Sequence, residues 1–240
     1  MVSRISTHVP GLDKLIQGGL PKGSITLISG TPGTGKSILS SQVAYNNALK
    51  GKKCLYLNLE QNEGRLENQM KQFGWDEKKV SKYLKVIAVD SSNPKLVDYL
   101  LKEIQNAKYD LIILDSLDSI SSNPLSVEEM SENKIDKIAQ FTIPTLMDSQ
   151  TIGRMKLKKI FSAIAKTGAT ALLTSERVEG ANGISRDTIS EFLCDGIIML
   201  KSTRVGSEFS RNIHVEKMRG TKIDPILHTF EFKKNGINVQ

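Results

Sequence analysis

The stretch Gly30-Thr31-Pro32-Gly33-Thr34-Gly35-Lys36-Ser37 decides the fold of this chain, because it matches the phosphate-binding loop (P-loop) pattern G-x-x-x-x-G-K-S in full. Its glycines let the backbone curl, so that consecutive N–H groups can point inward at phosphate oxygens. In this pattern the Lys36 ammonium reaches the β- and γ-phosphates, and the Ser37 hydroxyl binds Mg²⁺. The stretch therefore predicts that the chain binds a nucleoside triphosphate with its magnesium ion.

The residues on either side of this loop support the match. Ser24–Ser29 has the length and composition of a short buried strand, and Ile38–Lys50 has the pattern of a helix. The N-terminus of that helix would face the phosphates, where its N–H groups favour negative charge. An ordinary glycine-rich turn can match the same letters by chance, but such a turn needs no strand before it and no helix after it.

Strands and helices alternate through most of the sequence, which predicts an α/β fold with a mostly parallel central sheet and helices on both faces. Apolar runs of strand length lie at Ser24–Ser29, Cys54–Leu59, Leu84–Val89, Leu111–Asp115 and Ala169–Thr174. Helical patterns lie between them at Ile38–Lys50, Glu63–Phe73, Pro94–Asn106 and Met155–Thr167. After Asp187, runs at Gly196–Lys201, Arg211–Lys217 and Leu227–Phe232 predict a C-terminal antiparallel extension of the sheet. Residues 1–240 are thus predicted to form a single domain.

One connection breaks this rhythm. Ser121–Gly153 separates a predicted strand from its following helix by far more than the usual few residues, which is typical of a functional or disordered insertion. It is acidic in its middle and is followed by a basic stretch, and Ser131–Phe141 is predicted to form a short helix within it.

Two carboxylates lie at the ends of predicted strands, where a parallel sheet gathers its ligand-binding residues. Asp115 ends the apolar run Leu111–Asp115 and is predicted to hold Mg²⁺ together with Ser37. Glu60 follows the run Cys54–Leu59 and is predicted to activate the water that attacks the γ-phosphate. The alternatives are a plain strand end at Asp115 and a solvated helix cap at Glu60.

Composition is typical of a globular protein. Of the 240 residues 39% are hydrophobic, no apolar run reaches the roughly 18 residues of a membrane span, and the N-terminus lacks the apolar core of a signal peptide. We therefore expect a cytoplasmic protein without membrane contact. Cys54 and Cys194 show no metal-ligand spacing and are expected to be buried free thiols. The formal charge of +7 favours a polyanionic partner, although a lysine-rich solvated surface gives the same balance.

Several further motifs resemble those of the RecA/RadA superfamily, and within it the KaiC-like ATPases, which include archaeal single-domain RadA paralogues. The matching stretches are Pro10–Asp13, Gly18–Gly23, Phe73–Asp76, Asp115-Ser116, Gly168–Thr170, Thr174–Arg177 and the Lys-x-Arg-Gly-Thr motif at Lys217–Thr221. The resemblance covers nearly the whole chain except the connection 121–153. It implies a RecA-like core that binds ATP and Mg²⁺ and hydrolyses ATP, slowly because Gln61 stands where clock-type relatives carry a second glutamate.

The same resemblance implies an active site shared between subunits. In KaiC-like ATPases the Lys and Arg of the Lys-x-Arg-Gly-Thr motif complete the neighbour's site, which assigns Lys217 and Arg219 to that role. A planar guanidinium can bind two of the oxygens that carry charge in the transition state. Alternate residues of a strand share a face, so both side chains should point the same way. We therefore expect a homo-oligomer, either a hexameric ring or a filament; the alternative is a basic pair on a solvated strand.

Recombinases of this superfamily bind single-stranded DNA through two loops. One of them maps onto the 121–153 connection and the other onto Val178–Arg186. The basic residues that follow or flank these loops, and would neutralise backbone phosphates, are Arg154, Lys156, Lys158, Lys159, Arg177 and Arg186. Phe141 is the only aromatic residue in either loop, so base stacking would be sparse.

The leading hypothesis is therefore a RadA paralogue, an ATPase that binds single-stranded DNA and modulates recombinational DNA repair with a recombinase partner. The first alternative is a KaiC-like signalling scaffold whose nucleotide state controls protein partners, and the acidic residues Glu128, Glu129 and Glu132 in the connection favour it. A small-molecule kinase is the second alternative, against which the Lys217–Thr221 motif argues.

Overall fold

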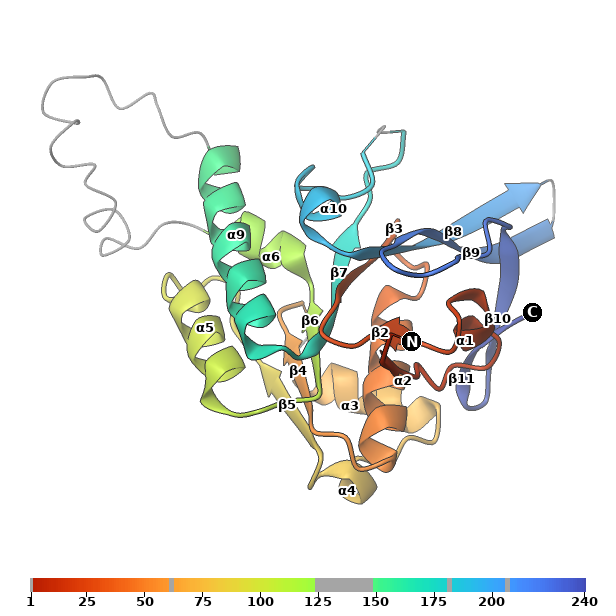
Figure 1. The fold of residues 1–240 in the computed structure, drawn as a ribbon, viewed down its shortest axis with the longest axis horizontal. Coiled ribbons are helices and arrows are strands. Elements are labelled where there is room, and N and C mark those ends of the chain that lie inside the picture. Colours follow the sequence, from red (N-terminus) through yellow and green to blue (C-terminus); the bar gives the residue numbers. More distant parts are fainter. Residues whose placement is uncertain (1, 61–62, 124–148, 181–182, 206–207) are drawn as a thin grey trace, which may run out of the picture.

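The computed structural model describes residues 2–60, 63–123, 149–180, 183–205 and 208–240. In this described part, one large sheet runs through the molecule with helices on both faces, as predicted (Figure 1). Its nine strands have the order β11-β10-β9-β8-β3-β7-β6-β4-β5. A small second sheet pairs β1 (Arg4–Ile5) with β2 (Leu20–Pro21).

The parallel part of the sheet contains the strands that the apolar runs predict. They are β3 (Ile25–Gly30), β4 (Cys54–Asn58), β5 (Leu84–Ala88), β6 (Leu111–Asp115) and β7 (Thr170–Glu176). β3, β4 and β6 are buried along their whole length, since helices cover both faces of the sheet. β3 lies in the interior of the sheet between β7 and β8, so the loop that follows it leaves from the middle of the carboxyl edge.

The antiparallel extension begins one strand later than the sequence predicts. β8 (Gly196–Val205) pairs with β3 in parallel, and Gly30 lies opposite Leu200. β9 (Glu208–Met218), β10 (His228–Lys233) and β11 (Gly236–Val239) then follow in antiparallel order. The run at the start of β8 gives no sign of its direction, because a strand buried on both faces reads as a continuous apolar run whichever way it pairs.

The helices form two layers, each with its own core. α2 (Lys36–Leu49), α3 (Glu63–Gln72) and α4 (Glu77–Val80) cover one face of the sheet, and α5 (Leu96–Asn106), α6 (Leu117–Ser121) and α9 (Ser149–Thr167) cover the other (Figure 1). Alternation along β6 supplies both cores, because Ile113 packs with the first layer and Ile112 with the second. Of the short helices, α1 (Leu12–Leu15) adds to the first core, and α10 (Ser190–Leu193) precedes β8.

The C-terminal end of the expected connection 121–153 is helical, because α9 already begins at Ser149. Gly153, expected to end the connection, lies inside α9, where it allows a close approach to α6. A Cβ atom at this position would lie only 2.7 Å from the backbone oxygen of Ser121. The helix predicted at 131–141 lies outside the described residues.

No helix in the described ranges is long and apolar enough to cross a membrane. Both cysteines, Cys54 and Cys194, are buried free thiols, as predicted.

Candidate active site

The P-loop, Gly30–Ser37, connects β3 to α2 through a backbone that glycine accepts most easily. Gly35 lies at the N-cap of α2 with a φ of 102°, in the left-handed region. No side chain of the described residues caps the first turn of this helix. Its leading N–H groups are therefore available to an anion, and a helix N-terminus of this kind binds phosphate.

Phe232 of β10 packs directly against this turn. A Cβ atom at Gly35 would lie 2.8 Å from the Cζ atom of Phe232, so a larger residue would displace the ring. Arg211 of β9 in turn stacks on Phe232, with its guanidinium carbon 4.5 Å from the ring centre. The antiparallel extension thus supports the P-loop. Sequence reasoning missed this role, because no local pattern links segments so far apart in the chain.

Lys36 is the first residue of α2, and its side chain is held at the loop. The residue is 7% exposed, and its Nζ donates to the carbonyl oxygens of Gly30 at 2.9 Å and Thr31 at 3.2 Å. A triphosphate would exchange these neutral acceptors for charged ones, which form stronger hydrogen bonds. The ammonium group therefore lies against the P-loop backbone, and its contact with the phosphates stays a prediction.

Asp115 lies at the end of β6, 2% exposed, and both of its carboxylate oxygens accept hydrogen bonds. The Thr174 hydroxyl donates to Oδ1 at 2.5 Å, and the Tyr56 hydroxyl donates to Oδ2 at 2.8 Å. On α2, the Ser41 hydroxyl donates to Tyr56 Oη at 3.2 Å, and Ser40 Oγ lies at the same distance. This network joins the helix that follows the P-loop to the carboxylate predicted to bind Mg²⁺.

Sequence reasoning missed Tyr56 and Thr174, although a signal was present. Each carries a hydroxyl group in a strand that the sequence predicts to be buried, and a buried hydroxyl needs a partner. Burial raises the pKa of Tyr56 well above its ordinary value, and the nearby Asp115 carboxylate raises it further. The phenol therefore stays protonated and acts as a hydrogen-bond donor.

Glu60 follows β4 at the same edge of the sheet. Asn58 of β4 lies opposite Asp115 in the sheet register, which places Glu60 just beyond that pair. The Ser116 hydroxyl donates to its carboxylate. Partial burial raises the pKa of Glu60, and the carboxylates of Asp115 and Glu176 add to this, while the Ser116 hydrogen bond and Lys36 oppose it. The site thus contains a carboxyl group that is easier to protonate than an ordinary glutamate, which suits a group that takes a proton from water.

A third carboxyl group, Asp118 of α6, was not singled out from the sequence. It is 8% exposed and accepts hydrogen bonds from the backbone N–H of Glu176 at 2.7 Å and the Ser175 hydroxyl at 3.2 Å. Burial raises its pKa from 3.8 to about 6, against these hydrogen bonds. Because Glu176 lies opposite Gly30 in the sheet, Asp118 fastens the end of β7 beside the P-loop.

Lys217 and Arg219 do not lie at the P-loop of their own chain. Lys217 of β9 lies opposite Ile197 of β8, and Ile197 lies opposite Leu27 of β3. The P-loop begins three residues further along β3, at Gly30. At about 3.3 Å per residue, this places Lys217 about 10 Å back along the strands. β9 also ends at Met218, so the alternation expected to align Lys217 with Arg219 stops between them.

Both side chains have partners within the chain. Nζ of Lys217 donates to the carbonyl oxygens of Cys194 at 2.7 Å and Glu191 at 3.2 Å. Nη1 of Arg219 lies 3.2 Å from Oδ1 of Asp195. The basic pair is therefore anchored around α10, away from its own nucleotide-binding loop.

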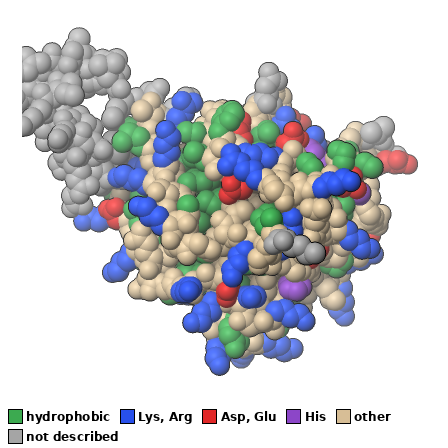
Figure 2. Space-filling model, viewed as in Figure 1, with side chains coloured by type: hydrophobic (Ala, Val, Ile, Leu, Met, Phe, Trp, Pro, Cys, Tyr) green, Lys and Arg blue, Asp and Glu red, His purple; other side chains and the backbone are tan. Residues whose placement is uncertain are grey.

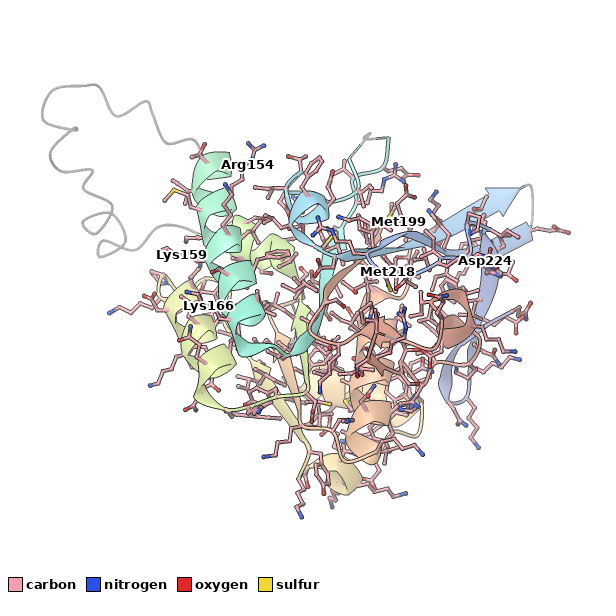
Figure 3. The ribbon with its side chains drawn as sticks, in the orientation of Figure 1. Arg154, Lys159, Lys166, Met199, Met218 and Asp224 are labelled. Carbon is pink, nitrogen blue, oxygen red and sulfur yellow. The ribbon has the colours of Figure 1, made fainter. Side chains whose placement is uncertain are left out.

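The basic residues predicted to contact DNA on α9 differ in their surroundings. Lys156 is 2% exposed, and its Nζ donates to the side-chain oxygen of Asn123 at 2.8 Å and to its backbone oxygen at 2.9 Å. This burial does not support a phosphate contact. Arg154, Lys158 and Lys159 are exposed, and Figure 3 labels Arg154 and Lys159 on α9. Nη2 of Arg154 donates to the Thr188 hydroxyl at 3.3 Å.

In the second loop, the predicted DNA contacts bind their own loop or a carboxylate. Nε of Arg177 donates to the carbonyl oxygen of Gly183 at 3.1 Å. Nη1 of Arg186 lies 3.4 Å from Oε2 of Glu176. These contacts fix the loop over the end of β7.

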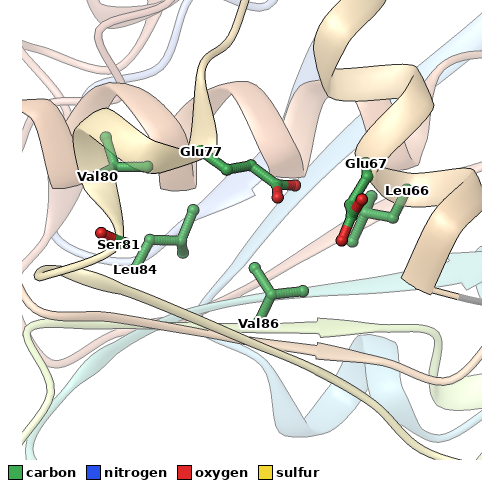
Figure 4. A pocket seen from close by; sticks show the side chains of 7 residues that line it. All are labelled: Leu66, Glu67, Glu77, Val80, Ser81, Leu84 and Val86. Atoms are coloured by element: carbon green, nitrogen blue, oxygen red, sulfur yellow. The ribbon is translucent and has the colours of Figure 1, made fainter.

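A pocket of about 220 Å³ lies apart from this site, between α3, α4 and β5 (Figure 4). Leu66, Val80, Leu84 and Val86 line it, with Glu67 and Glu77 at its sides. It contains none of the residues predicted to bind nucleotide.

A strand, a glycine-rich loop and a helix at the middle of a mostly parallel sheet, with a buried carboxylate on a nearby strand, define a P-loop ATPase domain with the RecA-like fold. The comparisons narrow this class. Residues 5–240 match the family described as ATPase: KaiC. The chain therefore belongs to the KaiC ATPase family, as its motifs predict.

Three known proteins illustrate this relationship. A UPF0273 protein of Saccharolobus solfataricus is 31% identical, and the match covers 100% of this chain and 83% of that protein. The circadian clock protein KaiC3 of Synechocystis is also 31% identical, over 92% of this chain and 42% of that protein. The crystal structure of a KaiC-like protein from Pyrococcus horikoshii covers 100% of both chains with a TM-score of 0.81 at 27% identity. None of these three is described as a recombinase or a DNA-binding protein.

Proposed function

We propose that this protein hydrolyses ATP with Mg²⁺ in an assembly of identical subunits, and that its nucleotide state controls the binding of a protein partner. The observation that carries the proposal is the convergence of three groups at one edge of the sheet. The P-loop, the Asp115 network and Glu60 all lie there. These are the parts that bind the phosphates, hold the metal and activate water.

The residues at this edge fit ATP and Mg²⁺. Ser37 and Asp115 offer a hydroxyl and a carboxylate, which are hard oxygen ligands of the kind that Mg²⁺ prefers. No group of three or more His, Cys, Asp or Glu residues in the described part of the chain forms a metal cage. Mg²⁺ bound with nucleotide needs no such cage, because phosphates and water supply its other ligands.

Each group in the site then has a role in hydrolysis. The N–H groups of the P-loop and the Lys36 ammonium stabilise the charge on the phosphates. The Glu60 carboxylate orients a water molecule and takes its proton, and the Ser116 hydroxyl holds that carboxylate in place. Tyr56 and Thr174 hold in place the Asp115 carboxylate that would bind Mg²⁺.

The position of Lys217 and Arg219 supports an assembly. They lie away from their own P-loop, so within one chain the charge that develops on the γ-phosphate lacks the pair of cations that the family motif supplies. In a ring or filament, these two residues would reach the P-loop of the next subunit. A homo-oligomer is therefore part of the proposal.

A protein partner is favoured over DNA by the surroundings of the basic residues. Lys156 is buried, and Arg177 and Arg186 bind their own loop and Glu176. The similarity to a circadian clock protein also agrees with a signalling role. Recombinational repair as a RadA paralogue with single-stranded DNA and a recombinase partner stays a prediction that none of these observations supports.

The test is phosphate release measured over a wide range of protein concentration. If the site is completed by a neighbour, the rate per subunit rises with concentration as the assembly forms. A constant rate per subunit down to dilute, monomeric protein would contradict a shared site. Absence of any ATP hydrolysis at assembled concentrations would contradict the proposed activity itself.

A further inference from the structure

A groove lies between α5 and α9, on the face of the sheet opposite α2. Its volume is about 470 Å³. Its apolar lining comes from Leu101, Met155 and Ala163, and its charged lining is entirely basic, from Lys158, Lys159 and Lys166. Two neutral polar residues, Gln105 and Ser162, complete the lining. Figure 3 labels Lys159 and Lys166 along α9. The groove is separate from the P-loop edge and contains none of the residues assigned to hydrolysis.

All the charged residues that line this groove are basic. α9 contains Arg154, Lys156, Lys158, Lys159 and Lys166, and between Ser149 and Thr167 no acidic residue. Among the described residues, no carboxylate lies within ion-pair distance of the three rim lysines. On α5, Glu103 is bound to Lys85 at 2.7 Å, and Asp98 lies in the first turn, before the part that lines the groove. Figure 2 shows basic side chains over this side of the molecule.

An apolar floor below lysines that have no carboxylate partner among the described residues fits a particular ligand chemistry. Apolar side chains would be buried against the floor, and carboxylates would reach the rim. Lys159 and Lys166 lie two helical turns apart, about 10 Å along α9. A second helix laid along the groove carries side chains at the same spacing.

We propose that this groove binds an acidic amphipathic helix of a partner protein, with apolar residues on the face between its carboxylates. This inference rests on the proposed function, since it names the chemistry of the partner that the nucleotide state would control. Single-stranded nucleic acid is the rival occupant. None of the described residues that line the groove has an aromatic side chain on which bases could stack, and the apolar floor would remain uncovered beneath a phosphate backbone.

The experiment uses a labelled helical peptide as its probe. The peptide has an alanine background, two glutamates two turns apart and two leucines between them. A control peptide has lysines in place of the glutamates, and a labelled oligothymidine is the nucleic-acid probe. Fluorescence anisotropy follows each probe during titration with the full chain at several salt concentrations.

We expect the acidic peptide to bind, and its affinity to fall as salt rises. The double charge reversal Lys158→Glu/Lys159→Glu should weaken the binding of the acidic peptide about tenfold or more. Met155→Ser should also weaken this binding, because it removes an apolar side chain from the floor of the groove. Lys50→Glu/Lys52→Glu makes the same charge change at the far end of α2 and should leave affinity unchanged. Circular dichroism confirms that each variant is folded.

Each of the following results would overturn the proposal: no binding of the acidic peptide at low salt, equal binding by Lys158→Glu/Lys159→Glu, or binding of oligothymidine but not of the peptide at this groove. The proposal is also overturned if Lys158→Glu/Lys159→Glu forms a smaller assembly than the wild type in the absence of peptide. The groove would then be a contact between copies of this chain. A different result would contradict the proposed function. A peptide that binds equally with and without a non-hydrolysable ATP analogue supports the groove and contradicts control by nucleotide.

Discussion

The Tyr56 hydroxyl donates a hydrogen bond to the Asp115 carboxylate, 2.8 Å away on the neighbouring strand. Because Ser41 of α2 donates to the same hydroxyl, the tyrosine transmits the position of the P-loop helix to the carboxylate predicted to hold Mg²⁺. The whole chain of hydrogen bonds is buried, where such networks are rigid when every member has a partner.

Tyr56→Phe should therefore weaken both the fold and the metal site. It leaves one oxygen of a buried carboxylate without its donor, which costs about 1–3 kcal/mol in the free energy of unfolding. We also expect stabilisation by ATP to require a higher Mg²⁺ concentration. Urea unfolding with and without MgATP measures both effects. Tyr99→Phe, at an exposed position on α5, is the matched control. Equal Mg²⁺ dependence in Tyr56→Phe and the wild type would contradict a positioning role.

Lys36→Ala should abolish hydrolysis and lower the affinity for ATP. The substitution removes the charge-assisted hydrogen bonds to the phosphates, each worth about 1.5–3 kcal/mol, or roughly tenfold to a hundredfold in affinity. Titration with a fluorescent ATP analogue measures the affinity, and Lys50→Ala at the other end of α2 is the control. Unchanged affinity in Lys36→Ala would remove the lysine from the site.

Glu60→Gln should keep ATP binding and lower the rate of hydrolysis by about 10²–10⁴-fold, because an amide cannot accept the proton from water. The wild-type rate should rise with pH as the base loses its proton. Since partial burial raises the pKa of Glu60, this rise should be centred at a higher pH than for an ordinary glutamate. Glu67→Gln, at a solvent-accessible position on α3, should change neither quantity. A rate unaffected in Glu60→Gln would refute the assignment.

Asp118 should make the stability of the fold depend on pH. Its pKa is raised from 3.8 to about 6, so the folded protein binds a proton more tightly than the unfolded chain. The contribution to stability is therefore complete below about pH 4 and is lost as pH rises through about 6, by an amount of order 3 kcal/mol. Asp118→Asn should lose this dependence, and exposed Asp98→Asn should retain it. Urea unfolding at several pH values, compared between variants, is the measurement. Parallel pH profiles for Asp118→Asn and the wild type would contradict it.

The parts of this fold that local patterns determine could be predicted from the sequence. The run Leu111–Asp115 is apolar throughout and ends in a carboxylate, so both its burial and its place at the carboxyl edge follow from the residues alone. The P-loop is equally local, since its pattern, the preceding strand and the following helix are contiguous.

Features that depend on contacts between distant segments could not be predicted. The sequence does not reveal that Tyr56, Thr174 and Asp115 meet. They meet because β4 and β7 lie on either side of β6, and the sequence does not give this strand order. It also does not separate Lys156, buried against Asn123, from exposed Lys158, because a helix crowded with lysines has no clear polar face. Gly153, expected to end the connection, instead packs against Ser121 from inside α9, which no pattern within α9 indicates.

The shared active site allows a test in which two inactive proteins restore activity. Lys36→Ala lacks a working P-loop but keeps its basic pair, and Lys217→Ala/Arg219→Ala lacks the pair but keeps its P-loop. Each alone should be nearly inactive. Mixed in equal amounts under conditions where subunits exchange, they should form complete sites at about a quarter of the contacts between neighbours, because such head-to-tail contacts join one half-site from each subunit. Phosphate release measures the recovery.

The control mixture combines Lys36→Ala with Glu60→Gln. Both changes lie in the half of the site that contains the P-loop, so every contact between subunits has a defect and no activity should return. If the first mixture stays as inactive as this control, Lys217 and Arg219 do not act on a neighbour. If Lys217→Ala/Arg219→Ala alone is fully active, the pair has no part in hydrolysis, and its contacts around α10 with Cys194 and Asp195 would be its only role.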